Sequence, residues 1–198
     1  MGFELVGKVW DAVSFKTYIQ EVNLSWANSV TIHHTASPSL AQRPQGFKIQ
    51  HMRNLAHYYG NQLGWSAGPH IFVDEDEYFG LSSLYRRGVH AVSFNSNSIG
   101  IEMLGQYDDL DDPKTGRGLD VVMNTAELVS ILLTKMKLKA NDQTVKFHRD
   151  DPKTNKTCCG KLIEKYWFLD LVNGFMDTGA NLTIEERLLR IERKIGLA

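Results

Sequence analysis

The sequence contains little of what marks several large classes of protein. Its two cysteines, Cys158 and Cys159, are neighbours in a chain of 198 residues, so they cannot join distant parts of the fold by a disulfide. Lys and Arg number 22 and Asp and Glu 23, and this balance argues against a nucleic-acid-binding face. Polar residues interrupt even the apolar segment 128–138, which is much shorter than the roughly 20 residues that span a bilayer. We therefore expect a soluble globular protein that binds no nucleic acid and does not insert into a membrane.

The N-terminal segment also lacks the features of a secretory signal. An acidic residue, Glu4, comes early, and no basic region is followed by an apolar core and a small-residue cleavage site. We therefore expect the protein to be cytoplasmic when it is synthesised. Its length fits one domain of ordinary size with a short appendage, and such a domain buries enough apolar surface to need no disulfide.

Short runs of β-branched and aromatic residues alternate along the chain with segments of helical periodicity. These runs predict strands at 29–32, 71–73, 77–79, 98–104 and 145–147. The periodic segments predict helices over 47–60, 126–136 and 163–175, with an exposed Asp-rich loop over 108–120. This order of elements predicts a single α/β domain over residues 1–177, with a mixed central sheet flanked by helices.

Residues 178–198 differ in character from the rest of the chain. Thr183 and Glu186 have the spacing of a capping box, which predicts the start of a charged helix. An apolar stripe of about two heptads then runs along Ile184, Leu188, Ile191 and Ile195. We expect a helical tail that docks on the domain or pairs weakly with a second copy, so that the protein is a monomer or a weak dimer.

Two histidines follow predicted strands, and a cysteine follows the second of them. His33 ends the strand at 29–32, His148 ends the strand at 145–147, and Cys158 lies ten residues beyond His148. A catalytic zinc ion typically takes three such protein ligands and keeps a fourth position for water, and a loop of this length can fold back onto one metal. Taken singly, each histidine more often has a structural role, and the cysteine pair also fits two small buried hydrophobic residues.

Several common zinc motifs are missing. The sequence has no His-Glu-x-x-His and no Cys-x-x-Cys, which excludes the usual metalloprotease, zinc-finger and zinc-deaminase patterns. A metal site in this chain must therefore be assembled from separate strands.

Four stretches of the sequence together resemble one known family. They are Thr31-Ile32-His33-His34-Thr35-Ala36, Ala67-Gly68-Pro69-His70-Ile71-Phe72-Val73, Asn97-Ser98-Ile99-Gly100-Ile101-Glu102, and His148-Arg149-Asp150 with Lys156-Thr157-Cys158-Cys159-Gly160. Their order and spacing over about residues 29–160 resemble the peptidoglycan amidases, which include phage lysozyme-type amidases, bacterial muropeptide amidases and animal peptidoglycan recognition proteins. The resemblance implies the α/β fold of that family and a zinc-dependent N-acetylmuramoyl-L-alanine amidase.

Carried over position by position, the resemblance implies a role for five residues. His33, His148 and Cys158 would bind one Zn²⁺, Lys156 would stabilise the developing oxyanion, and Glu102 would be the general base. A water activated by zinc would attack the lactyl-alanine amide while Glu102 accepts its proton. Glu102 also stands in an otherwise apolar strand, where an unpaired carboxylate is costly, so it is either functional or paired with a cation.

Two positions depart from the family's pattern. Pro69 stands where the phage branch has a tyrosine whose hydroxyl assists catalysis, so we expect Glu102 to do more of the proton transfer. Cys159 stands where a proline is usual, and the register favours Cys158 as the ligand. Weak substrate-binding roles are expected for three further histidines: His34, His70 and His90.

The resemblance therefore implies cleavage of the amide between N-acetylmuramic acid and L-alanine of the stem peptide. An enzyme of this kind is similar to endolysins that are released from the cytoplasm to act on the cell wall and lyse the host. Two alternatives stay open: a recognition module that binds peptidoglycan without cutting it, and a cytoplasmic enzyme that recycles soluble muropeptides. Retention of all three candidate ligands favours an enzyme.

Overall fold

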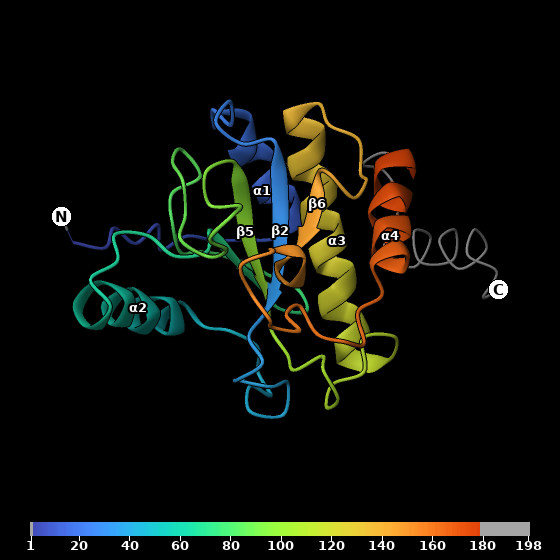
Figure 1. Ribbon diagram of the computed structural model, residues 1–198, viewed down its shortest axis with the longest axis horizontal. Helices are drawn as coiled ribbons and strands as arrows, with labels where there is room; N and C mark the ends of the chain where they lie inside the picture. Colours follow the sequence, from blue (N-terminus) through green and yellow to red (C-terminus); the bar gives the residue numbers. More distant parts are fainter. Residues whose placement is uncertain (1, 179–198) are drawn as a thin grey trace.

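The computed structural model describes residues 2–178, and in this part of the chain six strands form one mixed sheet (Figure 1). The strands are β1 (Val9–Trp10), β2 (Ser29–His34), β3 (Ile71–Val73), β4 (Tyr78–Gly80), β5 (Ser98–Met103) and β6 (Val145–Phe147). Their order in the sheet is β1-β4-β3-β5-β2-β6; β3, β5, β2 and β6 are parallel, and β4 is antiparallel to both of its neighbours, β1 and β3. The predicted α/β fold with a mixed central sheet is confirmed.

Different helices cover the two faces of this sheet. They are α1 (Ala12–Gln20), α2 (Ile49–His57), α3 (Gly116–Met136) and α4 (Lys165–Thr178). Successive residues of a strand project to opposite faces. In β4 the ring of Tyr78 packs edge-on against Phe15 of α1, with centroids 5.5 Å apart, whereas Phe79 packs against Phe47, two residues before α2, at 5.7 Å. Helix α1 and the α3–α4 pair beside it therefore cover one face, and α2 lies over the other (Figure 1).

The strand register places the residues of chemical interest on the face of α2. His33 is paired with Glu102 across β2 and β5, Glu102 with Phe72 of β3, and Phe72 with Phe79 of β4. Paired residues project to the same side of a sheet. Because Phe79 faces α2, His33 and Glu102 do so as well, while Ile32, which is fully buried, projects to the other face.

Most predicted elements are present, with differences at their ends. The predicted strands match β2 to β6, and the helix predicted over 47–60 is α2 followed by a π-helical turn (Tyr58–Gln62). The predicted loop over 108–120 is shorter, because α3 already begins at Gly116. Arg117 stabilises this start by an ion pair with Glu75, with nitrogen and oxygen 2.7 Å apart, a long-range contact that local composition does not reveal. The elements β1 and α1 were not predicted.

None of the helices in residues 2–178 is long and apolar enough to cross a membrane. The helical tail predicted for residues 178–198 lies outside the described residues apart from Thr178, the last residue of α4. That part of the domain division, and the weak dimer built on it, stay predictions.

Candidate metal centre and active site

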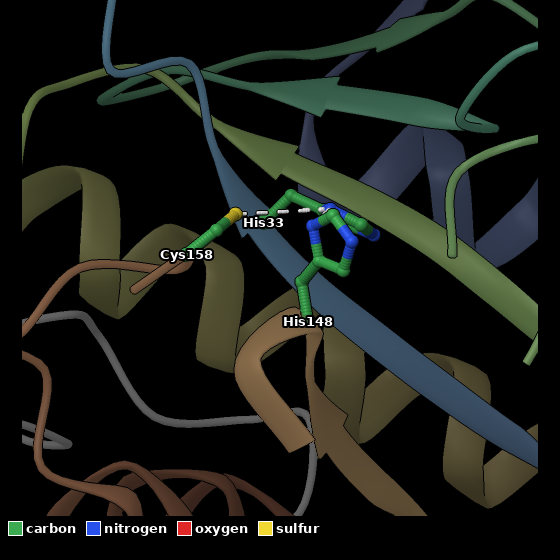
Figure 2. A group of neighbouring side chains, drawn as sticks. All are labelled: His33, His148 and Cys158. Atoms are coloured by element: carbon green, nitrogen blue, oxygen red, sulfur yellow. Dashed lines mark hydrogen bonds between the residues drawn. The ribbon is translucent and has the colours of Figure 1, made fainter. Parts of the chain in front are cut away.

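The three predicted metal ligands lie together at the carboxyl ends of parallel strands (Figure 2). Nδ1 of His33 is 3.1 Å from Nδ1 of His148 and 3.8 Å from Sγ of Cys158. One ligand atom from each of the three residues lies within 4.8 Å of the other two. Strands β2 and β6 are parallel neighbours, so His33 at the end of β2 meets His148, the first residue after β6.

A looped segment returns Cys158 to the two histidines, and Arg149 holds this segment in place. The backbone N–H of Arg149 donates to the carbonyl of Cys158, with nitrogen and oxygen 2.6 Å apart. The Arg149 guanidinium donates to the carbonyls of Gly160 and Ile163, at 2.5 and 2.6 Å. Gly160 has a φ of +107°, a conformation that a residue with a Cβ rarely adopts. The hydrogen bonds of Arg149 thus close the loop between His148 and Cys158.

The two cysteines point to different surroundings. Sγ of Cys158 faces His33 and accepts the backbone N–H of His34 at 3.4 Å, whereas Cys159 is fully buried in the hydrophobic core. Cys158 is therefore the cysteine that the geometry directs toward the histidines. Burial raises the pKa of the Cys158 thiol well above its usual value, and a metal would have to displace its proton.

The spacing of the donor atoms fits a tetrahedral zinc ion. Bond lengths of about 2.0–2.1 Å to nitrogen and 2.3 Å to sulfur place two tetrahedral nitrogens about 3.3 Å apart and a nitrogen and a sulfur about 3.6 Å apart. The corresponding distances from Nδ1 of His33, to Nδ1 of His148 and to Sγ of Cys158, are 3.1 and 3.8 Å. Two imidazoles and a thiolate are also a donor set that zinc prefers, so the residues present fit that metal.

A cavity of about 840 Å³ opens beside these ligands, and Glu102 and Lys156 both line it. Burial raises the pKa of Glu102 to about 8, and the nearby Lys156 cation opposes this shift. A carboxyl group with such a pKa can hold or release a proton near neutral pH, as a general base requires. The structure thus brings together all five residues to which the resemblance gave roles in zinc binding and catalysis.

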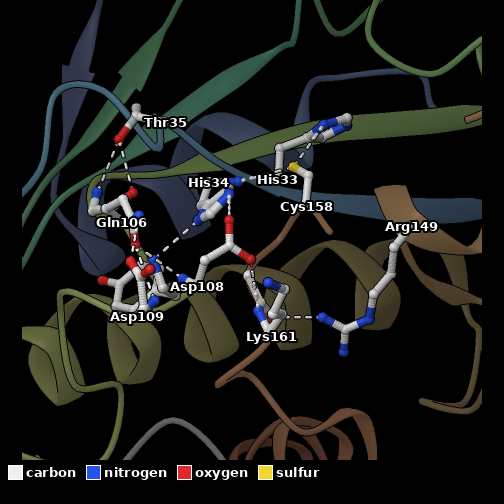
Figure 3. Close-up of polar contacts among 12 residues, drawn as sticks. His33, His34, Thr35, Gln106, Asp108, Asp109, Arg149, Cys158 and Lys161 are labelled. Carbon is white, nitrogen blue, oxygen red and sulfur yellow. Dashed lines mark hydrogen bonds and ion pairs between the residues drawn. The ribbon is translucent and has the colours of Figure 1, made fainter. Parts of the chain in front are cut away.

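His34 also lines the cavity, but other residues already hold its ring (Figure 3). Its Nδ1 accepts the backbone N–H of Tyr107 at 3.1 Å, and its Nε2 lies 3.8 Å from a carboxylate oxygen of Asp108. Asp108 in turn accepts the backbone N–H of Lys161 at 3.1 Å. His34 therefore connects the end of β2 to the loop that carries Cys158.

The other two histidines with a predicted substrate role differ in position. His70 is fully buried, does not line the cavity, and uses both ring nitrogens: Nδ1 accepts the backbone N–H of Gly100 at 2.9 Å, and Nε2 lies 3.0 Å from the carbonyl oxygen of Arg86. Burial lowers its pKa to about 3. His90 lines the cavity and contacts His33 directly, with Nδ1 of His90 3.1 Å from Nε2 of His33. His70 thus supports β5, and His90 contacts one of the candidate metal ligands.

Sequence reasoning missed two of these supporting residues. Arg149 lies in the His148-Arg149-Asp150 stretch, but no role was predicted for it. Its position between the candidate ligand His148 and the loop that leads to Cys158 could have indicated a structural role. Asp151 ties the His148 segment to the His90 segment, because its carboxylate accepts the backbone N–H of Ser93 at 3.0 Å. No local sequence pattern predicts this contact between Asp151 and Ser93.

Fold and site together define an α/β domain with a candidate metal-binding cluster in a cavity at the ends of parallel strands. The chain belongs to the N-acetylmuramoyl-L-alanine amidase family, whose match covers residues 24–161. As a member of this family it is a hydrolase that acts on peptidoglycan. No curated protein sequence matches the chain significantly.

Solved structures share the fold at low sequence identity. A mutant endolysin from Bacillus subtilis is 23% identical, with a TM-score of 0.54 over 74% of this chain and 86% of that one. The Ph2119 endolysin from a Thermus scotoductus bacteriophage is 18% identical, with a TM-score of 0.54 over 77% and 88%. Drosophila PGRP-LB is 19% identical, with a TM-score of 0.52 over 80% and 84%.

Proposed function

We propose that this protein is a zinc-dependent amidase that hydrolyses the bond between N-acetylmuramic acid and the L-alanine of the stem peptide, with residues 1–177 as the catalytic domain. The observation that carries the proposal is the meeting of His33, His148 and Cys158 beside Glu102 in one cavity. A zinc ion held by these three ligands would supply a Lewis acid and lower the pKa of a water molecule.

Glu102 would accept the proton of the attacking water and pass it to the leaving amine of L-alanine. It is suited to both steps, because a pKa of about 8 lets it exchange a proton near neutral pH. Lys156 would hold its ammonium against the oxygen that becomes negatively charged in the tetrahedral state. Pro69 lines the same cavity and has no proton to give, which leaves the acid–base work to Glu102.

The cell wall as site of action, and lysis of a host cell as purpose, are supported by the endolysins among the structures with this fold. The zinc amidase and the endolysin role are separate proposals, since the same chemistry would serve an enzyme that recycles soluble muropeptides. A peptidoglycan-recognition module without activity is the third reading.

One experiment separates these readings. Purified sacculi are incubated with the protein, and free stem peptides with a new L-alanine amino terminus are measured by mass spectrometry. We expect release that a chelator abolishes and zinc restores. Binding to sacculi without release would identify a recognition module, and release from soluble fragments alone would identify a recycling enzyme. Release that survives complete metal removal would contradict the zinc mechanism.

A further inference from the structure

The ring of His33 is held on both sides. Its Nδ1 faces His148 and Cys158, and its Nε2 lies 3.1 Å from Nδ1 of His90. The two rings meet edge to face, with centroids 5.1 Å apart and planes at 89°. Nε2 of His90 in turn lies 3.0 Å from the carbonyl oxygen of Ser98. The Ser98 carbonyl, the His90 ring and the His33 ring thus form a chain of hydrogen bonds from the backbone of β5 to the candidate metal ligands.

The chemistry of these groups fixes where the protons are. A carbonyl oxygen accepts hydrogen bonds and never donates one, so Nε2 of His90 carries the proton. In a neutral imidazole the other nitrogen is then an acceptor, and Nδ1 of His90 must receive the proton of Nε2 of His33. The remaining nitrogen of His33, Nδ1, is left with a free lone pair. That lone pair points at His148 and Cys158, where a metal would need it.

Both rings are neutral in the folded protein, as this arrangement requires. Each ring has one nitrogen that donates a proton and one that is left as an acceptor, which is the state of a neutral imidazole. A metal ligand must likewise be a neutral imidazole.

His90 itself is fixed by its own loop and by a glycine of the sheet. The backbone N–H groups of His90 and Ala91 both donate to Oδ1 of Asn95, at 2.8 and 2.9 Å. The His90 ring lies over Gly100 of β5, where an added Cβ would come within 2.6 Å of its Cγ and Cδ2 atoms. Gly100 therefore leaves the room in which the His90 ring stands beside His33.

We propose that His90 is a positioning residue that selects the Nε2-protonated tautomer of His33 and so directs its Nδ1 lone pair to the metal. The proposal rests on the zinc site put forward above. Hydrogen-bonded partners of this kind commonly set the tautomer and orientation of metal-binding histidines, and their loss weakens metal binding about 10–100-fold. His90 then has no ring nitrogen left for substrate, which replaces the substrate-binding role expected from the sequence.

The first test needs no metal. Long-range ¹H–¹⁵N correlation spectra of the metal-free protein report which ring nitrogen of each histidine carries the proton. We expect His33 to be protonated at Nε2 in the wild type. In His90→Phe, which keeps a ring but removes the acceptor, we expect His33 to move to the Nδ1-protonated form. A wild-type His33 protonated at Nδ1, or an unchanged tautomer in His90→Phe, would overturn the proposal whatever the enzyme's activity.

The second test measures zinc affinity by competition with a chromogenic chelator. His90→Phe should bind zinc about 10–100-fold more weakly than the wild type. His90→Asn, whose Oδ1 restores an acceptor near the place of Nδ1, should recover part of that loss. Gly100→Ala keeps His90 but displaces its ring, and should weaken binding as well. His57→Ala, on the exposed side of α2, is the matched control and should bind as the wild type does.

The variants also guard against a loss of folding. If His90→Phe is unfolded by circular dichroism, the wild-type tautomer and the His90→Asn and Gly100→Ala affinities decide. Either an Nδ1-protonated His33 in the wild type or wild-type zinc affinity in folded Gly100→Ala would then sink the proposal. Failure of the amidase assay alone, with zinc bound and the tautomer as expected, would contradict the proposed function and leave the role of His90 standing.

Discussion

His33 and Glu102 are direct partners across the parallel strands β2 and β5, and both side chains project to the face that bears the cavity. The backbone pairing of two central strands therefore sets the separation of a metal ligand from the candidate general base. A one-residue slip of either strand would turn one of the two side chains to the opposite face. The buried residues of both strands oppose such a slip, because a slip would exchange the side chains that pack on the two covered faces of the sheet.

Glu102→Gln should abolish most of the activity while leaving zinc bound. Glutamine keeps the shape of the side chain but accepts no proton, and a positioned general base contributes about 10²–10⁴-fold to a rate. Release of stem peptides and zinc content would be measured on the same preparation. Glu21→Gln, at an exposed position after α1, is the control and should keep full activity. Activity of Glu102→Gln within a few-fold of the wild type would reject the role of Glu102.

Lys156→Ala should slow turnover by at least about two orders of magnitude without loss of zinc. Loss of one donor to an oxyanion costs about 2.7–4 kcal/mol in other enzymes. Lys153 lines the same cavity three residues earlier, so Lys153→Ala removes a neighbouring charge as a matched control. We expect this control to lower turnover far less. Equal effects of the two substitutions would point to general electrostatic attraction of the substrate and away from a specific role for Lys156.

The site residues that lie in recognisable motifs could be predicted from the sequence. His33, His148 and Cys158 were predicted from strand ends and spacing together with the family resemblance, and the roles of Glu102 and Lys156 were predicted from the resemblance. The contact between His90 and His33 could not be predicted from the sequence. The two residues are 57 positions apart, and only the folded chain brings their rings together.

Helix α1 illustrates the same limit in the fold. Its cap is local, with Asp11 accepting the backbone N–H of Ser14 at 2.7 Å, but its short apolar face is defined by tertiary packing. Phe15 and Ile19 are both completely buried against the rest of the core, and two buried residues in nine carry little periodic signal.

Cys158→Ser and Cys159→Ser should separate metal binding from stability. Cys158→Ser removes the thiolate beside His33, and we expect zinc to bind more than about 100-fold more weakly, which exceeds the effect of losing a supporting residue. Cys159→Ser should keep its zinc but place a hydroxyl in the core at a cost of about 1–3 kcal/mol of unfolding free energy. Zinc content and urea unfolding of both variants would be measured in parallel. The reverse pattern would show that Cys159 is the ligand.

The metal-free protein should lose stability in acid, and His70 should account for part of that loss. The pKa of His70 is about 3 in the folded protein and near 6.5 when unfolded, so between these values the unfolded chain binds more protons. Its contribution to stability is therefore complete above about pH 6.5 and falls by up to about 1.4 kcal/mol per pH unit below that.

Glu102 has the opposite sign. Its pKa is about 8 in the folded protein against 4.5 for the free side chain, so its contribution is lost as the pH rises between these values. The two effects oppose each other from about pH 4.5 to 6.5, and the difference between variants is the informative quantity. Urea unfolding of the wild type and of His70→Gln from pH 4 to 7 should show a flatter acid dependence in the variant, whereas His57→Ala should follow the wild type. Parallel curves for the wild type and His70→Gln would mean that the pKa of His70 does not differ between the folded and unfolded states, contrary to what its burial requires.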